Sequence, residues 1–280
     1  MTVKQMWTVA AALAVAGMIG VQAAQAAELF AGDGGPQNLY TVPIAGGAAT
    51  STTGVGIPTG GLAHDIASGT LYGIDGKANA SSLHSYDRTT GQSTNIGNTT
   101  ADWLGGAAFD NVTGKLWGGG TVPAFMWASG SVPEAKLHEL DPSNAAILST
   151  VDVIGHRIEG LAANGGTVWG ISEAAYVYEI NTSDGSFSNV IDLVPGEPRG
   201  NNSPPSGGAT LGGAYQAGFI YATDCCESDT LYRVKVSSGG VSSVSLTGFD
   251  NLFGLAPTVP EPASLALLTL GGLLMLRRRR

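Results

Sequence analysis

Three short hydrophobic patterns recur along the chain in fixed rotation. Each occurs five times, and successive copies of a pattern begin roughly 40 to 54 residues apart. The first pattern is Gly-x-Ala, and its copies begin at Gly61, Gly106, Gly160, Gly212 and Gly254. The second is an aliphatic, an aromatic and a small residue, with copies beginning at Leu29, Leu71, Leu116, Val168 and Ile220. The third is an aliphatic residue followed by a ring, with copies at Leu39, Leu83, Leu137, Val177 and Leu231.

These repeats predict the fold. Each has a weaker fourth strand, such as residues 93–96 or 241–244, and a repeat of this length spans one four-stranded propeller blade. The chain begins with the second pattern and ends with a fifth copy of the first, so the strand at Gly254 would complete the blade that starts at Leu29. We therefore predict an all-β, five-bladed β-propeller closed by its C-terminal strand. The alternative is a β-sandwich or an open sheet array, but neither requires a circularly permuted repeat.

The connections between the predicted strands divide into two kinds. Short Asp/Asn/Gly turns, for example at residues 65–69 and 87–91, join the first strand to the second and the third to the fourth. Both kinds of short turn fall on one face of a meander, which we call the short-turn face. The other connections include long irregular segments at residues 119–135 and 193–209. They define the long-loop face, where we expect function, because long loops on a rigid scaffold are where binding residues gather.

The C-terminal tail has the layout of a sorting signal. It reads Val259, Pro260, Glu261 and Pro262, then a charge-free apolar run over residues 263–276, then Arg277, Arg278, Arg279 and Arg280. The run is short for a spanning helix, which needs about 20 residues, and the arginines would stay in the cytoplasm.

The tail resembles the PEP-CTERM sorting signal. The resemblance implies export in a Gram-negative, matrix-producing bacterium, transient anchoring of the C-terminal hydrophobic helix in the inner membrane, and processing by an exosortase. It also implies a final place at the cell surface or in the extracellular matrix of a biofilm. Similar tails occur on unrelated surface proteins, some labelled ice-binding, so the resemblance names no activity.

The N-terminus agrees with export. Lys4 supplies a positive charge, residues 7–21 are apolar, and Ala24-Gln25-Ala26 forms a small-x-small cleavage site, as in a secretory signal peptide recognised by the export machinery. An uncleaved membrane anchor is the alternative. The predicted organisation is a signal peptide at residues 1–26, a propeller at 27–257 and the sorting signal with its short transmembrane helix at 258–280.

Composition narrows the partners. Without the two signals the chain keeps 8 basic and 21 acidic residues, a net charge near −13, which makes nucleic acid a poor partner and suits cations. The only cysteines, Cys225 and Cys226, are adjacent, so within one chain they can pair only with each other. A vicinal disulfide is the favoured interpretation; intermolecular pairing, free thiols and a soft-metal site stay open.

Strand-end aspartates are the candidate metal ligands. Asp33, Asp75 and Asp224 follow the second strand at equivalent positions in three blades. Carboxylates gathered near one axis could hold Ca²⁺, a hard cation that takes six to eight oxygen ligands. The alternative is that each aspartate simply closes an Asx-turn.

The candidate catalytic residues are His156, Arg157 and Glu159, which share one predicted long-loop position and could carry acid–base chemistry. No nucleophile elbow, zinc motif, phosphate-binding loop or dinucleotide fingerprint occurs. We therefore expect a binding or structural module for exopolysaccharide, cation or protein. The alternative is a secreted lyase or hydrolase that acts on matrix sugars or lactones. Ice binding would need a regular Thr-rich array, which the sequence lacks.

Overall fold

The computed structural model describes residues 28–33, 38–52, 60–76, 80–101, 103–121, 134–196, 210–224, 230–249 and 252–258. All of them belong to one compact unit, Glu28–Thr258. The predicted signal peptide, the sorting tail from residue 259 onward and both cysteines lie outside the described residues. Within the described ranges no helix could span a membrane.

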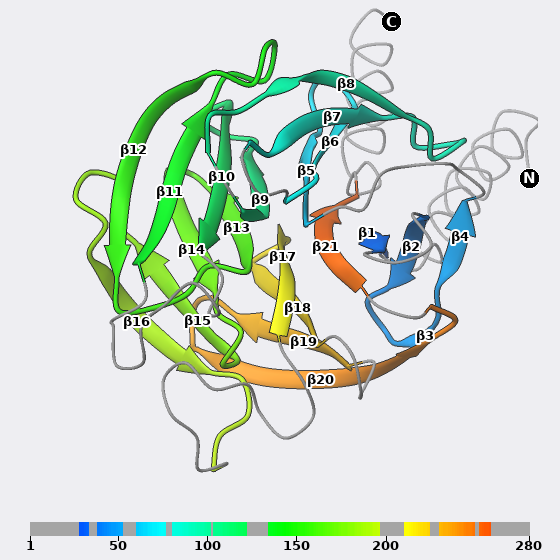
Figure 1. Cartoon of the computed structure of the whole chain (residues 1–280). Helices are drawn as coiled ribbons and strands as arrows, with labels where there is room; N and C mark the ends of the chain where they lie inside the picture. The colour runs from blue at the N-terminus through cyan, green and yellow to red at the C-terminus, as the bar shows by residue number, and fades with distance from the viewer. Residues whose placement is uncertain are drawn as a thin grey trace, which may run out of the picture. The chain divides into compact units, whose positions relative to one another are not determined.

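The described strands form five antiparallel blades (Figure 1). From inner to outer strand they are blade 1, β21 (Leu252–Pro257), β1 (Glu28–Asp33), β2 (Leu39–Pro43) and β4 (Thr50–Thr52); blade 2, β5 (Gly61–Asp65), β6 (Thr70–Ile74), β7 (Ser82–Tyr86) and β8 (Ser93–Asn98); blade 3, β9 (Leu104–Asp110), β10 (Lys115–Thr121), β11 (Glu134–Leu140) and β12 (Ile147–Ile154); blade 4, β13 (Gly160–Asn164), β14 (Thr167–Ile171), β15 (Tyr176–Ile180) and β16 (Phe187–Asp192); blade 5, β17 (Thr210–Gln216), β18 (Phe219–Asp224), β19 (Thr230–Lys235) and β20 (Gly240–Thr247). A two-residue strand, β3 (Gly47–Ala48), joins the edge of blade 5.

The C-terminal strand closes the ring, as the permuted repeat predicts. β21 pairs antiparallel with β1, and Phe30 lies opposite Ala256. Figure 1 shows β21, in orange, beside the blue strands from the start of the chain. The five-bladed propeller and its closing strand are confirmed, and the β-sandwich alternative is wrong.

The register explains why the second and third sequence patterns occur together. In every blade the small residue of the second strand lies opposite the ring residue of the third strand: Ala31 and Tyr40, Gly73 and His84, Gly118 and His138, Gly170 and Tyr178, Ala222 and Tyr232. The ring folds across its small partner. A Cβ added to Gly170 would lie 2.5 Å from Cζ of Tyr178, so a larger residue there would displace the ring.

The glycines of the first pattern let the five inner strands meet backbone to backbone. We call Gly254, Gly61, Gly106, Gly160 and Gly212 the glycine ring. A Cβ built on any of the first four would lie 2.5 to 3.0 Å from the carbonyl carbon of the next glycine in the ring, and one on Gly212 would lie 3.0 Å from the carbonyl oxygen of Phe253. Side chains at these positions would push neighbouring blades apart.

Polar side chains tie neighbouring blades together on the short-turn face. The Asn111 side chain of blade 3 accepts a hydrogen bond from the Ile66 N–H (2.7 Å) and donates one to the His64 carbonyl (2.9 Å), both in blade 2. Asp110 accepts hydrogen bonds from the backbone N–H groups of residues 165–166 in blade 4, at 2.9 and 2.6 Å. These turn residues therefore also form hydrogen bonds that join neighbouring blades.

The end of the closing strand is held by three neighbours on the same face. His64 donates from Nδ1 to the carbonyl of Pro257 (2.7 Å). The Thr258 N–H donates to Oε1 of Gln216 in blade 5 (3.1 Å), and its hydroxyl donates to the carbonyl of Glu28 (2.7 Å). Both ends of the propeller thus leave it at the short-turn face.

A second seam closes at the outer edge, and the repeats did not predict it. β3 pairs in parallel with the end of β20, with Leu246 opposite Gly47. The Ala49 N–H adds a hydrogen bond to the carbonyl of Thr247 (2.7 Å). Blades 1 and 5 are therefore joined at the rim as well as through the inner strands.

Replacing Gly160 with alanine tests the glycine ring. The new Cβ would lie 2.5 Å from the carbonyl carbon of Gly212, so we expect a loss of about 3 kcal/mol in the free energy of unfolding. In the control, Gly240→Ala, the nearest atom is Oγ of Ser238 at 3.4 Å, and the change should stay within about 0.5 kcal/mol. Urea titrations compare the two, and equal effects would contradict the ring as the limiting contact.

Replacing His138 with tyrosine tests the ring position. His138 bonds through Nδ1 to the Thr150 hydroxyl (2.8 Å), and burial, with Lys136 adding to it, lowers its pKa from 6.5 to about 4. The unfolded chain binds this proton more readily, so stability should fall as the pH drops from 6.5 to about 4. Tyrosine, found at this position in three other blades, should fold and flatten that slope in urea titrations across the range. An unchanged slope would show that other groups set the acid sensitivity.

Candidate functional site

The described part of the long-loop face centres on blade 4. Its connection between the second and third strands is a tight turn, in which the Ser172 N–H donates to the carbonyl of Tyr176 (2.9 Å) and Ala175 N–H to that of Ser172 (3.0 Å). The predicted long loops fall largely at residues 122–133 and 197–209, outside the described residues. Residues 155–159, which lead into blade 4, are described and hold the candidate catalytic side chains.

Glu159 stands where each of the other four inner strands has an uncharged residue. It precedes the glycine of the first pattern, as Gly60, Gly105, Leu211 and Phe253 do. Its N–H bonds to the carbonyl of Ile171 (2.9 Å), the residue that also lies opposite Gly160. Gly60 makes the same bond to the carbonyl of Ile74 in blade 2 (2.7 Å), so the backbone of Glu159 follows the repeat and only its side chain differs. Oε2 of Glu159 lies 3.2 Å from the place that a Gly105 Cβ would take, so the carboxyl reaches the neighbouring blade.

The surroundings of Glu159 make its carboxyl a weak acid. Burial raises its pKa from 4.5 to about 7, although Arg157 acts in the opposite direction. Within the described residues no hydrogen bond is made to this carboxyl. A group with this pKa, held at the end of the inner strands, could bind a ligand through hydrogen bonds or exchange a proton at neutral pH.

Arg157 is fixed at both its side chain and its backbone. Its guanidinium forms an ion pair with Glu173, in the tight turn of blade 4. Its carbonyl accepts a hydrogen bond from the hydroxyl of Tyr178 (2.5 Å), whose ring is fully buried. Sequence reasoning missed Glu173; the shortness of the 172–175 connection, which brings this side chain back toward Arg157, was the available signal. We call Arg157, Glu159 and Glu173 the charged cluster.

The structure places His156 apart from this cluster. Its ring is 6% exposed, stacks on Tyr178 with centroids 4.8 Å apart, and meets the edge of Phe187 at 4.3 Å. Burial among these rings lowers its pKa. No hydrogen bond or charge interaction within the described residues joins His156 to Glu159. Of the three candidate catalytic residues, the structure brings Arg157 and Glu159 together and leaves His156 in an aromatic cluster.

The strand-end aspartates occupy equivalent positions, as expected. Oδ1 of Asp75 accepts a hydrogen bond from the N–H of Ser82 (2.6 Å), which closes the connection between β6 and β7. Asp224 is 2% exposed at the end of β18, and the side chain of Asp33 lies outside the described residues. No three His, Cys, Asp or Glu side chains in the described ranges are grouped so that they could hold a metal ion. Ca²⁺ binding by this set stays a prediction, and Asp75 has a loop-closing role.

Fold and site define an exported propeller with a charged cluster beside its axis. Residues 258–280 match the PEP-CTERM protein-sorting motif, so the chain carries the signal for exosortase-dependent sorting that its tail suggested. The match begins at Thr258, the residue that binds Glu28 and Gln216 at the end of the closing strand. No curated protein sequence matches the chain.

Several solved structures are similar to this chain. A structure described as a nidogen/laminin complex has 14% sequence identity and a TM-score of 0.51, over 82% of this chain and 97% of that chain. Glutaminyl cyclase of Myxococcus xanthus has 19% identity and a TM-score of 0.45, over 81% and 84%. A periplasmic gluconolactonase of Pseudomonas aeruginosa has 10% identity and a TM-score of 0.43, over 80% and 84%. Identities this low show a likeness of fold alone.

Replacing Glu159 with glutamine should stabilise the protein at alkaline pH. The folded state holds the Glu159 proton up to about pH 7, whereas the unfolded chain releases it near its ordinary pKa of 4.5. The wild type therefore loses stability as pH rises through this interval. We expect a gain of about 1 to 2 kcal/mol for Glu159→Gln at pH 8 and a smaller gain at pH 5. Thermal unfolding at both values measures it.

The matched control for this experiment is Glu173→Gln. That variant breaks the ion pair with Arg157 and should destabilise the protein at pH 8. A gain for Glu159→Gln that is the same at both pH values would contradict a buried, protonated carboxyl.

Proposed function

We propose that this exported protein is a polysaccharide-binding module of the cell surface or extracellular matrix, and that the charged cluster on its long-loop face holds the ligand. The observation that carries the proposal is Glu159. The residue is half-buried, and desolvation raises the pKa of its carboxyl to about 7, which lowers stability at neutral pH and above. A ligand that donates hydrogen bonds to this carboxyl would relieve that cost.

The chemistry of the cluster suits a sugar. Arg157 offers a planar set of N–H donors. Glu159 and Glu173, the two acids that interact with it, offer acceptor oxygens. Adjacent hydroxyl groups of a sugar need such alternating donors and acceptors. The negative charge of the propeller argues against nucleic acid and other polyanions as ligands.

The placement of the chain ends supports this use of the long-loop face. Glu28 and Thr258 lie together on the short-turn face, and the sorting motif begins at Thr258. While the tail anchors the protein in the inner membrane before exosortase processing, the opposite face would point away from the attachment. That face would therefore stay accessible to matrix components.

A second candidate function is a secreted lyase or hydrolase acting on matrix sugars or lactones. The pKa of about 7 for Glu159 favours it, since a carboxyl with this pKa is suited to general acid–base catalysis at neutral pH. His156 has no place in such a mechanism as the structure stands, because its ring packs against Tyr178 and Phe187.

Titration calorimetry with polysaccharides, followed by analysis of the products, separates the two functions. For a binding module we expect saturable heat without products, and at least about tenfold weaker affinity for Arg157→Ala, which removes charge-assisted hydrogen bonds. The control His156→Phe should keep the aromatic packing and bind normally. Products that disappear in Glu159→Gln would establish the enzyme instead, and the absence of both binding and turnover would overturn both functions.

A further inference from the structure

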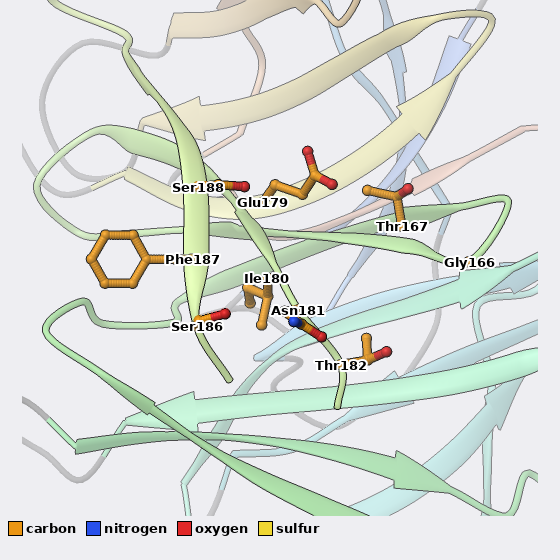
Figure 2. A pocket seen from close by; sticks show the side chains of 9 residues that line it. All are labelled: Gly166, Thr167, Glu179, Ile180, Asn181, Thr182, Ser186, Phe187 and Ser188. Atoms are coloured by element: carbon orange, nitrogen blue, oxygen red, sulfur yellow. The ribbon is translucent and has the colours of Figure 1, made fainter. Parts of the chain in front are cut away.

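A polar depression lies on blade 4, beside the turn that joins β15 to β16 (Figure 2). It has a volume of about 360 Å³, which is in the lower part of the range of roughly 300 to 1,000 Å³ for small-molecule sites. Thr167, Glu179 and Ser188 come from three successive strands, β14, β15 and β16, and Asn181, Thr182 and Ser186 come from the turn that follows β15. Figure 2 shows the Phe187 side chain pointing away from the others.

Register brings the polar groups of the depression onto one side of the sheet. Glu179 lies opposite Trp169 on one neighbouring strand and opposite Ser188 on the other. Trp169 stacks on Tyr215 of blade 5, with ring centroids 5.5 Å apart and planes 5° from parallel. This stack joins the two blades, and Thr167 and Glu179 lie next to Trp169 on the same side of the sheet.

Several hydrogen-bonding groups in the depression have capacity left. Oε2 of Glu179 accepts a bond from the Asn189 side chain (2.8 Å), and Oδ1 of Asn181 accepts bonds from Ser183. Within the described residues, Oε1 of Glu179, the amide NH₂ of Asn181 and the Thr167 hydroxyl have no partner. The depression therefore presents an acceptor, a donor and a hydroxyl that can act as either.

Comparison with blade 3 shows why this site is open. Lys115 and Glu139 hold the positions that Thr167 and Glu179 hold in blade 4. In blade 3 the lysine Nζ lies 2.8 Å from Oε2 of Glu139 and covers that acid. Threonine cannot do so in blade 4, which leaves the carboxylate of Glu179 facing solvent.

Blade 5 covers the same place in another way. There Phe219 and Arg233 take the two positions, and the guanidinium carbon lies 3.5 Å from the centre of the phenylalanine ring. Blades 3 and 4 both have a glutamate at this place, and only the glutamate of blade 4 has no cation over it.

We propose that the depression on blade 4 binds a neutral, hydroxyl-rich ligand, a sugar residue of a polysaccharide. The single carboxylate disfavours anions, and one carboxylate without further charged ligands is a poor site for a divalent cation. Neighbouring sugar hydroxyls match the paired acceptor and donor of Glu179 and Asn181. The site is separate from the charged cluster and shares with the proposed function only the class of ligand.

Thr167→Lys is the decisive variant, because it copies the ion pair of blade 3 into blade 4. The lysine should pair with Glu179, keep the fold and close the depression. Calorimetry on the full-length protein, in a detergent without a sugar headgroup, would use cellotetraose, maltotetraose and N-acetylchitotetraose as probes. We expect at least one probe to bind saturably, with affinity reduced about tenfold or more by Thr167→Lys and by Glu179→Gln.

Two controls separate this site from the charged cluster. Lys115→Thr alters the matched position in blade 3 and should leave the affinity at blade 4 unchanged. Arg157→Ala should weaken only binding at the charged cluster, and the component of binding that Thr167→Lys removes should remain in this variant. Binding that survives Thr167→Lys but is lost in Arg157→Ala would overturn the blade 4 site and leave the proposed function standing. If none of the probes binds, or if every variant binds as the wild type does, the blade 4 site is wrong.

Discussion

The contact of five inner strands without intervening side chains is the constraint on which the rest of the structure depends. Because the glycine ring allows each inner strand to touch the next, the blades come close enough for Asn111 and Asp110 to bond across their turns. The same constraint shapes the candidate site. Gly105 adds no side chain where the Glu159 carboxyl lies, since Oε2 is 3.2 Å from the place that a Gly105 Cβ would take, and the acid therefore reaches the neighbouring blade. The close approach of the inner strands and the position of the Glu159 carboxyl therefore both depend on glycines.

Most of the fold could be predicted, because whatever repeats in the structure also repeats in the sequence. The small residue of the second strand and the ring of the third recur together since they lie opposite each other, as Gly170 and Tyr178 do. The closing strand was visible as a fifth Gly-x-Ala copy. The β3–β20 pairing was not, because it involves a single blade edge and a two-residue strand with no recurring pattern. Nor were the bonds between blades, which depend on how turns from different repeats approach one another.

The candidate site was predictable only in part, for a related reason. His156, Arg157 and Glu159 are close in sequence, but an irregular segment does not fix where each side chain points. Packing of the His156 ring against Tyr178 and Phe187 favours the neutral imidazole, and it leaves Nδ1 buried without a partner in the described residues. Arg157 instead pairs with Glu173, which lies in the connection between β14 and β15. No local sequence motif indicates this pair. Asp75 shows the opposite case, since its bond to the Ser82 N–H follows from the ordinary chemistry of strand ends.

Differences between blades carry more information about function than their likeness does. A repeated scaffold solves its packing in the same way in each blade, so a residue that departs from the pattern and lowers stability calls for another reason. Blade 4 has two such departures on different surfaces. Glu159 stands where blades 2 and 3 have glycine, and its desolvated carboxyl disfavours folding as the pH rises. Glu179 stands where blade 2, which has the same threonine as Thr70, has Ser85, and where blade 3 pairs its acid with a lysine. Neither change improves packing within the blade, and each exposes or strains an acidic group that a ligand could satisfy. The residues of blade 4 that differ from the equivalent residues of the other blades are therefore the best candidates for function in this propeller.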